Sequence, residues 1–451
     1  MKIIVAGCGR VGYEIAEQLI KENNEITVID TNYKILDEVS SECDVIGYHG
    51  DCTSFETLKT AGVEDTDLLI ATTDQDEKNM LACLIAKKVG NCQTIARVRS
   101  PQYSKEIVYL KEELGLSMSI NPEYAVADEM VRLIKIPSAF EVDTFYKGLI
   151  NLVSFSIPEN SPLNNVAIKD ARAKLGSNVL ICVVRRGDEI TIPGGDFVLK
   201  SNDMVSLALS LADVNTVYNA FGIKTKKIKN VLIAGGGTIS YYLAIKLIET
   251  GIKVKIIEKS RERCEELAEL IPGAVIINGD ATDKSLLEEE SIDKMDAVCS
   301  IMNSDEENIL LSLYISNMSD VKVMTKIHRN SYEDIAKTLP IGHVISTKKI
   351  TAEYIIRYVR SMKNAFNNNV EALYRMMDDR VEALEFVVQD DKKFEGKPLK
   401  NLQIKSNTLV CSIYRKNRII RPGGNDYIKK GDNVVVVTTN TGLNDIEDIL
   451  E

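Results

Sequence analysis

The sequence predicts an α/β fold with two tandem Rossmann-like lobes, each with a doubly wound parallel sheet and each followed by a small α+β, β-rich lobe. Three observations support this prediction. The chain repeats itself, each repeat opens with apolar strands that alternate with amphipathic helices, and each repeat closes with short strands between glycine-rich turns. The predicted lobes cover residues 1–139, 140–224, 228–368 and 369–451.

The repeat is visible at anchors spread over the whole chain. Gly50-Asp51-Cys52-Thr53 resembles Gly279-Asp280-Ala281-Thr282, and Pro193-Gly194-Gly195 resembles Pro422-Gly423-Gly424, each pair 229 residues apart. The opening segments that end at Gly9 and Gly237 are similar at an offset of 228. A nearly constant offset over such a distance indicates duplication of one unit of about 225 residues.

Apolar runs of strand length alternate with helical patterns at the start of the first repeat. Strands are predicted at Ile3–Ala6, Ile26–Ile29, Val45–Tyr48, Leu68–Ala71, Thr94–Val98 and Ser117–Ile120. Helices are predicted at Val11–Lys21, Lys34–Ser40, Ser54–Ala61, Glu77–Val89 and Tyr103–Leu114. Strands that are apolar throughout and alternate with helices are typical of a parallel sheet covered on both faces.

A further amphipathic helix is predicted at Glu123–Ile136, with a counterpart at Thr351–Asn364 in the second repeat. Because each follows the last strand, neither is needed to cover its own sheet. We expect these helices to carry assembly contacts with a partner subunit. Core helices within one chain are the alternative.

The pattern changes between Val142 and Gly222, where strand runs at Leu149–Ile157, Val179–Arg185 and Met204–Leu209 alternate with turns. Short strands with glycine-rich turns predict a small β-rich lobe with one or two helices. A short basic linker, Lys224–Lys229, joins the repeats, and the second repeat follows the same plan.

The composition is that of a globular protein, with 45% hydrophobic and 27% charged residues in 451. The net charge of -11 and the absence of a long Lys/Arg run argue against nucleic acid as a partner. No apolar stretch reaches the roughly 18–20 residues that span a bilayer, and the first residues do not form a signal peptide. Nine scattered cysteines predict reduced thiols and a cytoplasmic protein.

The strongest local motif is Gly7-Cys8-Gly9-Arg10-Val11-Gly12, which ends the first strand and opens the first helix. In this context the first glycine makes the tight turn, the second lets the backbone approach a phosphate, and the third lets the helix pack on the strand. The helix N-terminus then attracts the anionic phosphate. The motif predicts a nucleotide site; a glycine turn used only for packing is the alternative.

Two charged residues refine this prediction. Asp30 ends the second strand, where a carboxylate accepts hydrogen bonds from ribose hydroxyls and repels a 2′-phosphate, which favours NAD or an adenosine nucleotide over NADP. Arg10 follows the second glycine, where its guanidinium would reach a di- or triphosphate. A solvated arginine at the helix start is the other interpretation of Arg10.

The second copy of the motif, Gly235-Gly236-Gly237-Thr238-Ile239-Ser240, is degenerate. Ser240 stands where the third glycine is expected, and Thr238 replaces the arginine, so direct neutralisation of a phosphate is lost. Glu258, 228 residues after Asp30, keeps an acid at the ribose position. We expect this copy to bind a dinucleotide; a lobe kept only for its interfaces is the alternative.

Open α/β sheets bind ligands beyond the carboxyl ends of their strands. The candidates there are Asp51, Cys52, Thr72, Thr73 and Asp74, with Asp280 and Ala281 in the second copy. Arg97 and Arg99 are predicted on the fifth strand, two residues apart and so on one face. They are interpreted either as phosphate ligands or as partners in a salt bridge at the sheet edge, and Lys326 and His328 are their counterparts.

No catalytic or metal-binding constellation is recognisable. His49, His328 and His343 show no metal spacing, and there is no nucleophile elbow or P-loop motif. A dehydrogenase needs a proton-transferring group that faces the nicotinamide, and the small lobes are poor in histidine. We therefore expect no enzyme, with a soluble NAD-dependent oxidoreductase as the alternative.

Together these segments resemble the regulator-of-potassium-conductance (RCK) family. The resemblance is carried by the first glycine loop with Asp30, the turn at residues 50–53, Ala71-Thr72-Thr73 and Ala96-Arg97-Val98-Arg99. Patterns in the small lobes, including Ser161-Pro162-Leu163 and Lys397-Pro398-Leu399, resemble the C-terminal domain of the family. The resemblance covers essentially the full chain in the tandem form of this family.

The resemblance implies a regulatory subunit that binds NAD, NADH, ATP or ADP. Such proteins form a ring, commonly a homotetramer for tandem forms, on the inner face of the membrane beneath a potassium channel or transporter subunit of the TrkH or KtrB type. Nucleotide exchange shifts the angle between lobes and gates the membrane partner.

Site residues of the family carry over to positions of this chain. Phosphate contacts fall on Gly7, Cys8, Gly9, Arg10 and Val11, and ribose contacts fall on Asp30 and Glu258. Contacts beside the adenine or the phosphates fall on Asp51, Thr72, Thr73, Arg97 and Asp280. We hypothesise that the first copy senses ATP, ADP and NADH and that the second is a more static NAD site.

Overall fold

The structure is a computed structural model. It describes residues 1–136, 141–145, 149–176, 179–223, 227–318, 321–367, 370–377, 380–390, 393–394, 396–440, 442–443 and 445–451. Four sheets organise these residues, two parallel and two antiparallel, which confirms the predicted fold class. Part of the predicted basic linker, residues 224–226, lies outside the described residues.

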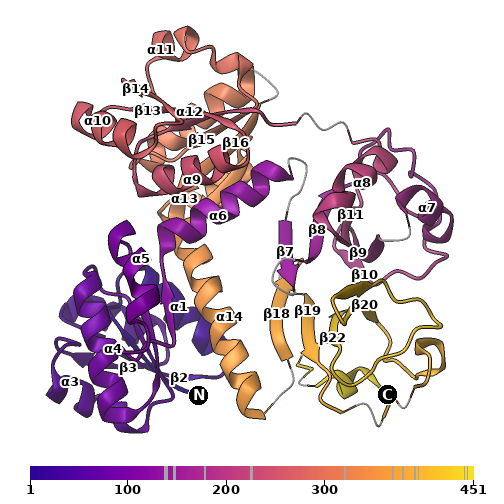
Figure 1. The fold of residues 1–451 in the computed structure, drawn as a ribbon, viewed down its shortest axis with the longest axis horizontal. Helices are drawn as coiled ribbons and strands as arrows, with labels where there is room; N and C mark the ends of the chain where they lie inside the picture. Colours follow the sequence, from indigo (N-terminus) through magenta and orange to yellow (C-terminus); the bar gives the residue numbers. More distant parts are fainter. Residues whose placement is uncertain are drawn as a thin grey trace. The chain divides into compact units, whose positions relative to one another are not determined.

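The first Rossmann lobe is a six-stranded parallel sheet in the order β3-β2-β1-β4-β5-β6 (Figure 1). Its strands are β1 (Lys2–Ala6), β2 (Glu25–Asp30), β3 (Val45–His49), β4 (Leu68–Ala71), β5 (Gln93–Arg97) and β6 (Met118–Ile120). Its helices are α1 (Arg10–Lys21), α2 (Tyr33–Glu42), α3 (Phe55–Thr60), α4 (Asp76–Gly90), α5 (Pro101–Leu110) and α6 (Pro122–Lys135). The strand order reverses between β1 and β4, which is the point where such sheets bind ligands.

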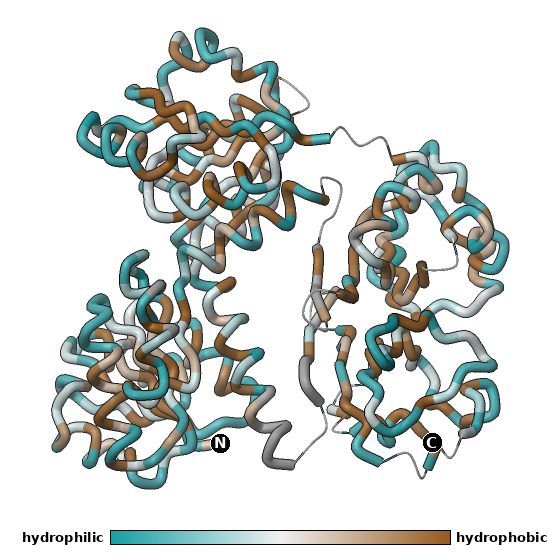
Figure 2. Tube along the Cα trace, in the orientation of Figure 1, coloured by the Kyte–Doolittle hydropathy of each residue, from teal (hydrophilic) through white to brown (hydrophobic). Residues whose placement is uncertain are grey.

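The second Rossmann lobe repeats this arrangement in the order β14-β13-β12-β15-β16-β17. Its strands are β12 (Asn230–Ala234), β13 (Lys253–Glu258), β14 (Val275–Asn278), β15 (Ala297–Ser300), β16 (Lys322–Ile327) and β17 (His343–Ser346). Its helices are α9 (Thr238–Glu249), α10 (Arg261–Leu270), α11 (Lys284–Glu289), α12 (Asp305–Met318), α13 (Asn330–Thr338) and α14 (Thr347–Asn367). Figure 2 shows hydrophobic residues concentrated on the inner strands of this lobe and hydrophilic residues on its outer helices.

Each small lobe is a five-stranded antiparallel sheet, in the orders β10-β9-β11-β8-β7 and β18-β19-β22-β20-β21. The first contains β7 (Glu141–Phe145), β8 (Ile150–Ser156), β9 (Leu180–Arg186), β10 (Glu189–Thr191) and β11 (Met204–Leu209), with α7 (Ile168–Leu175) and α8 (Val214–Phe221). The second contains β18 (Val370–Met376), β19 (Val381–Val387), β20 (Thr408–Arg415), β21 (Arg418–Ile420) and β22 (Asn433–Thr438).

The chain divides into two compact units that do not follow the order of the repeats. One unit joins both Rossmann lobes, Met1–Ile134 with Lys227–Ile356, and the other joins both small lobes, Lys135–Lys226 with Arg357–Glu451. The two small lobes share a hydrophobic core, in which the rings of Phe145 and Tyr374 lie 4.5 Å apart. No helix in the described part of the chain combines the length and apolar character needed to cross a membrane.

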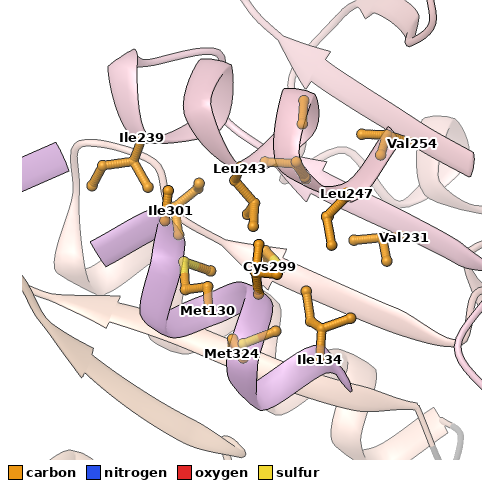
Figure 3. Packing of buried hydrophobic residues seen from close by; sticks show 14 of the residues in the cluster. Met130, Ile134, Val231, Ile239, Leu243, Leu247, Val254, Cys299, Ile301 and Met324 are labelled. Atoms are coloured by element: carbon orange, nitrogen blue, oxygen red, sulfur yellow. The ribbon is translucent and has the colours of Figure 1, made fainter. Parts of the chain in front are cut away.

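Helix α6 leaves the first Rossmann lobe and packs into the core of the second. Figure 3 shows Met130 and Ile134 of α6 facing Leu243 and Leu247 of α9, with Cys299 of β15 beside them, and all five side chains are buried. The expectation that the apolar face of this helix packs on a partner subunit is therefore wrong. Duplication has placed a second lobe on the same chain, and that lobe covers the face.

Helix α14 makes reciprocal contacts with elements of the first lobe. Its Lys348 ammonium lies 3.4 Å from the Glu14 carboxylate of α1, and the Tyr354 hydroxyl accepts a hydrogen bond of 3.2 Å from Arg132 of α6. The helix begins at Thr347 rather than at the predicted Thr351. The early start carries Lys348 to the first lobe, which matters for the site described next.

Candidate nucleotide sites

The first glycine loop has the geometry that close approach of a phosphate requires. Gly7 has a φ of +88°, and a Cβ added there would lie 2.7 Å from the Thr73 nitrogen. A Cβ at Gly12 would lie 2.0 Å from the Gly7 carbonyl oxygen, whereas a Cβ at Gly9 would meet nothing within 4 Å. Gly7 and Gly12 are therefore needed for packing, and Gly9 leaves open space in front of the first turn of α1.

The Asp30 carboxylate holds this loop in place. It accepts a hydrogen bond of 2.7 Å from the backbone N–H of Cys8 and one of 2.8 Å from that of Asn32. The sequence predicted a ribose acceptor here. The structure places Asp30 against a cavity of about 100 Å³ together with Asp51, Cys52 and Thr73. The carboxylate therefore orients the glycine loop and lines the crevice beside it.

Asp51 and Cys52 line the same crevice, but the pKa of the first is lowered and that of the second is raised. The pKa of Asp51 is lowered because its carboxylate accepts hydrogen bonds from the backbone N–H and the hydroxyl of Thr53, and Lys78 adds a cation at 3.5 Å. Cys52 is buried, and its burial raises the pKa of the thiol to about 11. Cys8 is buried in the same way, with a pKa raised to about 12. Both thiols stay protonated at neutral pH and act as small apolar groups.

Asn79, for which the sequence predicted no role in a site, organises the carboxyl ends of β4 and β5. Its side chain is fully buried, accepts a hydrogen bond of 2.8 Å from the Thr73 N–H, and donates one of 2.9 Å to the Arg97 carbonyl. Asn308 repeats the arrangement with Met302 and Lys326 in the second lobe. Asn79 and Asn308 are each the fourth residue of a helix that begins with two acidic residues. That pattern is the sequence signal that could have identified them.

A cavity of about 330 Å³ lies between the two Rossmann lobes at the phosphate loop. The first lobe contributes Gly9, Arg10, Val11, Thr72, Arg97, Arg99 and Glu123, and the second contributes His328, Thr347 and Lys348. Four cationic side chains thus line the cavity together with one carboxylate, that of Glu123. The Glu123 Oε1 lies 2.8 Å from Arg99 Nε. The cavity is suited to an anion with several charges.

Three polar atoms around this cavity are buried without a hydrogen-bond partner among the described residues: Arg97 Nε, Glu123 Oε2 and Thr347 Oγ1. Buried polar atoms are nearly always paired, so these three atoms leave hydrogen-bonding capacity for a ligand in the cavity. Burial also lowers the pKa of Arg97, whose Nη1 donates weakly to the carbonyls of Thr72 and Thr73. Arg97 ends β5 and Arg99 lies beyond the strand, yet both line the cavity as their predicted common face required.

The second lobe has a larger cavity, of about 410 Å³, on the ribose side of its glycine loop. Its lining includes Gly235, Gly236, Gly237, Glu258, Asp280 and Ala281 from the predicted set. Thr238, Ile239 and Ser240 lie in the first turn of α9, outside this lining. Glu258 copies Asp30 closely: it accepts hydrogen bonds of 2.7 Å from the N–H groups of Gly236 and Ser260.

Two cations line this second cavity that sequence reasoning missed. Arg263, in the first turn of α10, donates from Nε to the Gly236 carbonyl at 2.7 Å, and Lys259 pairs with Asp280 at 2.8 Å. Hydrogen bonding from Lys259 is the main cause that holds the pKa of Asp280 well below its usual range. The second loop has Thr238 where the first has Arg10. Its nearby cation is Arg263, which reaches the loop from α10.

The counterparts of Arg97 and Arg99 have diverged. Lys326 is buried, donates to the Ile301 carbonyl at 2.9 Å, and has its pKa lowered to about 8 by burial. It does not line the second cavity, while His328 lines the cavity between the lobes. Within the described residues no cluster of three or more His, Cys, Asp or Glu side chains is placed to hold a metal ion.

Comparison with protein families matches almost the whole chain. The TrkA-N domain matches residues 3–122 and 231–347, and the TrkA-C domain matches residues 152–222 and 383–451. The chain belongs to the TrkA family. Both candidate sites fall within the two TrkA-N matches, apart from Glu123 and Lys348, each of which lies one residue beyond a match.

Curated TrkA relatives align over their full length. The Trk system potassium uptake protein TrkA homolog of Archaeoglobus fulgidus is 33% identical over 449 residues, covering 100% of both chains. The Trk system potassium uptake protein TrkA of Halomonas elongata is 32% identical over 455 residues, covering 100% of this chain and 99% of its own. The predicted relationship to Trk potassium uptake proteins is therefore confirmed.

Solved structures share the tandem architecture. The GsuK channel bound to NAD has a TM-score of 0.63 at 16% identity and covers 97% of this chain and 77% of its own. The GsuK RCK domain has a TM-score of 0.62 at 17% identity, with coverage of 97% and 92%. At this level of identity the likeness concerns the fold, and it confirms the tandem RCK arrangement of the TrkA-N and TrkA-C lobes.

Proposed function

We propose that this chain is the regulatory subunit of a potassium uptake system, that it is not an enzyme, and that it gates a membrane-embedded partner in response to NAD(H), ATP and ADP. Its full-length relatives are named Trk system potassium uptake proteins, which supports the potassium-transport role. Solved structures with a similar fold include the GsuK channel bound to NAD and GsuK bound to ADP. The proposed setting is the inner face of the cell membrane, on a TrkH- or KtrB-type subunit, as a homotetramer.

The cavity between the two TrkA-N lobes is the observation that carries this proposal. A nucleotide whose first phosphate lies on the Gly9 loop would extend its last phosphate toward Arg10, Arg97 and Lys348. Arg10 and Arg97 belong to one lobe and Lys348 to the other. A ligand can shift a conformational equilibrium only by binding the two states unequally, and contacts on both lobes provide that difference.

The charges of this cavity favour a ligand with a terminal phosphate. Coulomb interactions between a polyphosphate and several partly buried cations are stronger than in water, and ATP carries more charge there than ADP. In this proposal the first lobe reads the number of phosphates, and its Asp30 holds the ribose of ATP, ADP or NADH. The second lobe, with Glu258, holds NAD as the more constant ligand.

Calorimetric titration of the full chain with ATP, ADP, NADH and NAD tests the two-site model. We expect Asp30→Ala to abolish one class of site and Glu258→Ala the other. Asp37→Ala and Glu262→Ala, exposed acids on α2 and α10, serve as matched controls that retain binding. Arg10→Ala and Lys348→Ala are each expected to weaken ATP by about tenfold and to reduce its advantage over ADP.

Function is tested by potassium flux into vesicles that contain a Trk-type membrane subunit and the full chain. ATP and ADP are expected to change the flux in opposite directions, and Arg10→Ala is expected to remove that difference. Unchanged flux with both nucleotides would overturn the regulatory role. Steady oxidation of NADH with a small substrate would favour the oxidoreductase instead.

A further inference from the structure

The two lobes differ in the cations that line the cavities beside their glycine loops. In the first lobe Arg10, Arg97 and Arg99 gather at the phosphate end, beside the start of α1. In the second lobe the cation at the loop is Arg263, which belongs to α10 and lies on the ribose side. The counterpart of Arg263, 228 residues earlier, is Ile35, which lines none of the first-lobe cavities described above.

The position of Arg263 is defined by hydrogen bonds. Its Nε donates to the Gly236 carbonyl at 2.7 Å, and its Nη1 lies 2.6 Å from the Glu266 carboxylate. Gly236 in turn donates its N–H to Glu258. The guanidinium is therefore fixed beside the ribose acid with 27% of its side chain exposed, and its orientation is set before a ligand arrives.

Apolar side chains line the cavity that Arg263 faces. Ile257 comes from the end of β13, Ala281 from the turn after β14, and Met302 from the loop after β15. A guanidinium plane and apolar groups that line one cavity form a slot for a flat, polarisable ring. In a Rossmann-type sheet, the ring next to the ribose acid is the adenine of the nucleotide.

The charge of the same cavity opposes a terminal phosphate. Three lining carboxylates, Glu258, Asp280 and Glu307, face two cations, and one of these, Lys259, is already paired with Asp280. The matching cavity of the first lobe is acidic as well, with Asp30, Asp51 and Asp74 beside Lys78. The cations suited to a terminal phosphate there, Arg10, Arg97 and Arg99, line the other cavity. A neutral ring and a single phosphodiester suit such a cavity, whereas a dianionic phosphate suits it poorly.

We propose that Arg263 forms the stacking wall of an adenine subsite, so that the second TrkA-N lobe selects the adenosine half of its ligand rather than its terminal phosphates. This inference rests on the proposed function, since it requires the second lobe to bind a nucleotide. It assigns a specificity role to a residue outside the glycine loop. The first lobe then reads phosphate number, and the second reads the base.

The test uses the full chain with Asp30→Ala, so that nucleotide binding is measured at the second site alone. AMP and CMP, which share ribose and phosphate and differ in the base, are titrated by calorimetry, with NAD as a third probe. Arg263→Ala is expected to weaken AMP and NAD by about tenfold, equivalent to about 1.4 kcal/mol, and CMP by much less. Arg261→Ala is the matched control, because Arg261 lies on the same turn, is exposed, and pairs with Glu265 outside the cavity.

Two further variants separate stacking from charge. Arg263→Lys keeps the charge without the planar face and is expected to recover little of the affinity for AMP. Ile35→Arg in a chain with Glu258→Ala is expected to raise the preference of the first site for AMP over CMP. Equal losses for AMP and CMP in Arg263→Ala, or full recovery by Arg263→Lys, would overturn the stacking role.

Failure of the proposed function gives a different result from failure of this inference. If the Asp30→Ala chain keeps its thermal unfolding midpoint and binds no nucleotide, the second site itself is refuted. If it binds AMP and Arg263→Ala binds AMP equally well, the site stands and the role of Arg263 is refuted.

Discussion

The Ser240 hydroxyl donates a hydrogen bond to the carbonyl oxygen of Gly235, five residues earlier in the second glycine loop. In the first lobe the equivalent carbonyl belongs to Gly7, and it accepts from the Thr72 hydroxyl at 2.7 Å. Ile301 stands at the position of Thr72 in the second lobe. The two lobes thus satisfy the same loop carbonyl with hydroxyls from different elements, which explains how the second loop tolerates serine at the third glycine position.

Because the two lobes use different hydroxyl donors for one carbonyl, we predict that the stability effects of mutations at Gly12 and Thr72 in the first lobe are coupled. Gly12→Ser alone places a side chain against the Gly7 carbonyl and is expected to cost about 1–3 kcal/mol of unfolding free energy. Thr72→Ile alone leaves that carbonyl unpaired, at a similar cost. The double variant is expected to cost less than the sum, by about 1 kcal/mol in a urea-unfolding cycle. Strict additivity would contradict the exchange.

Substitutions at the second and third glycines of the first loop are predicted to have different effects, on nucleotide binding at Gly9 and on stability at Gly12. Gly9→Ala meets no atom within 4 Å and should leave the unfolding midpoint unchanged, while it weakens nucleotide binding by blocking approach of the phosphate. Gly12→Ala should lower the midpoint, because its Cβ would lie 2.0 Å from a carbonyl oxygen. Thermal unfolding and calorimetric titration on the same samples separate the effects. Normal nucleotide binding in a folded Gly9→Ala chain would argue against the site.

Asn79→Ala is expected to destabilise the first lobe by about 1–3 kcal/mol, because it leaves the Thr73 N–H and the Arg97 carbonyl without their partner. Urea unfolding measures the change. Asn317→Ala is the control, since Asn317 is exposed on α12 and bonds only within its own helix. Equal effects of the two substitutions would show that Asn79 does not organise the strand ends.

Met130→Ala is expected to cost about 2–5 kcal/mol, because Met130 is fully buried in the core that α6 forms with the second lobe. Leu243→Ala, on the facing helix, should cost a similar amount, and the pair should show coupling. Leu310→Ala is the control, at 66% exposure on α12. If Met130→Ala left the unfolding free energy unchanged, the packing of α6 on the second lobe would not contribute to the stability of the chain.

The protein is predicted to lose stability as the pH falls from about 6.5 to about 4. Burial, with help from Lys322, lowers the pKa of His343 from 6.5 to about 4. Between these values the folded state binds fewer protons than the unfolded state, so the unfolding free energy rises with pH. Lys322, whose pKa burial lowers to about 8, keeps its charge throughout this window.

Urea unfolding at a series of pH values checks this dependence. His343→Gln should flatten part of the slope, and His328, whose pKa is also lowered by burial, should retain the rest. His49→Gln, at an exposed position, is the control. A slope that His343→Gln leaves unchanged would assign the acid sensitivity to other groups.

Much of the architecture could be predicted because it depends on local patterns. The central strands of both parallel sheets are mostly apolar, and amphipathic helices lie between the strands, so the positions of these elements were recoverable to within a few residues. Boundaries were less accurate where a turn continues a helix: α5 ends at Leu110 rather than Leu114, and α14 begins four residues before the predicted start. The extra strands β7 and β10 are short and polar in part, and no pattern distinguished them from turns.

The amino-acid sequence by itself determined the duplication, the four lobes in their order, and the glycine loops with their acids, because each of these is a property of neighbouring residues. Only the tertiary structure decided that α6 packs on the second lobe, that His328 and Lys348 line the cavity beside the first glycine loop, and that Arg263 bonds to the second loop. These contacts join residues far apart in the chain. They depend on which surfaces of separate lobes meet, and a periodic pattern can show that a face is apolar without showing what covers it.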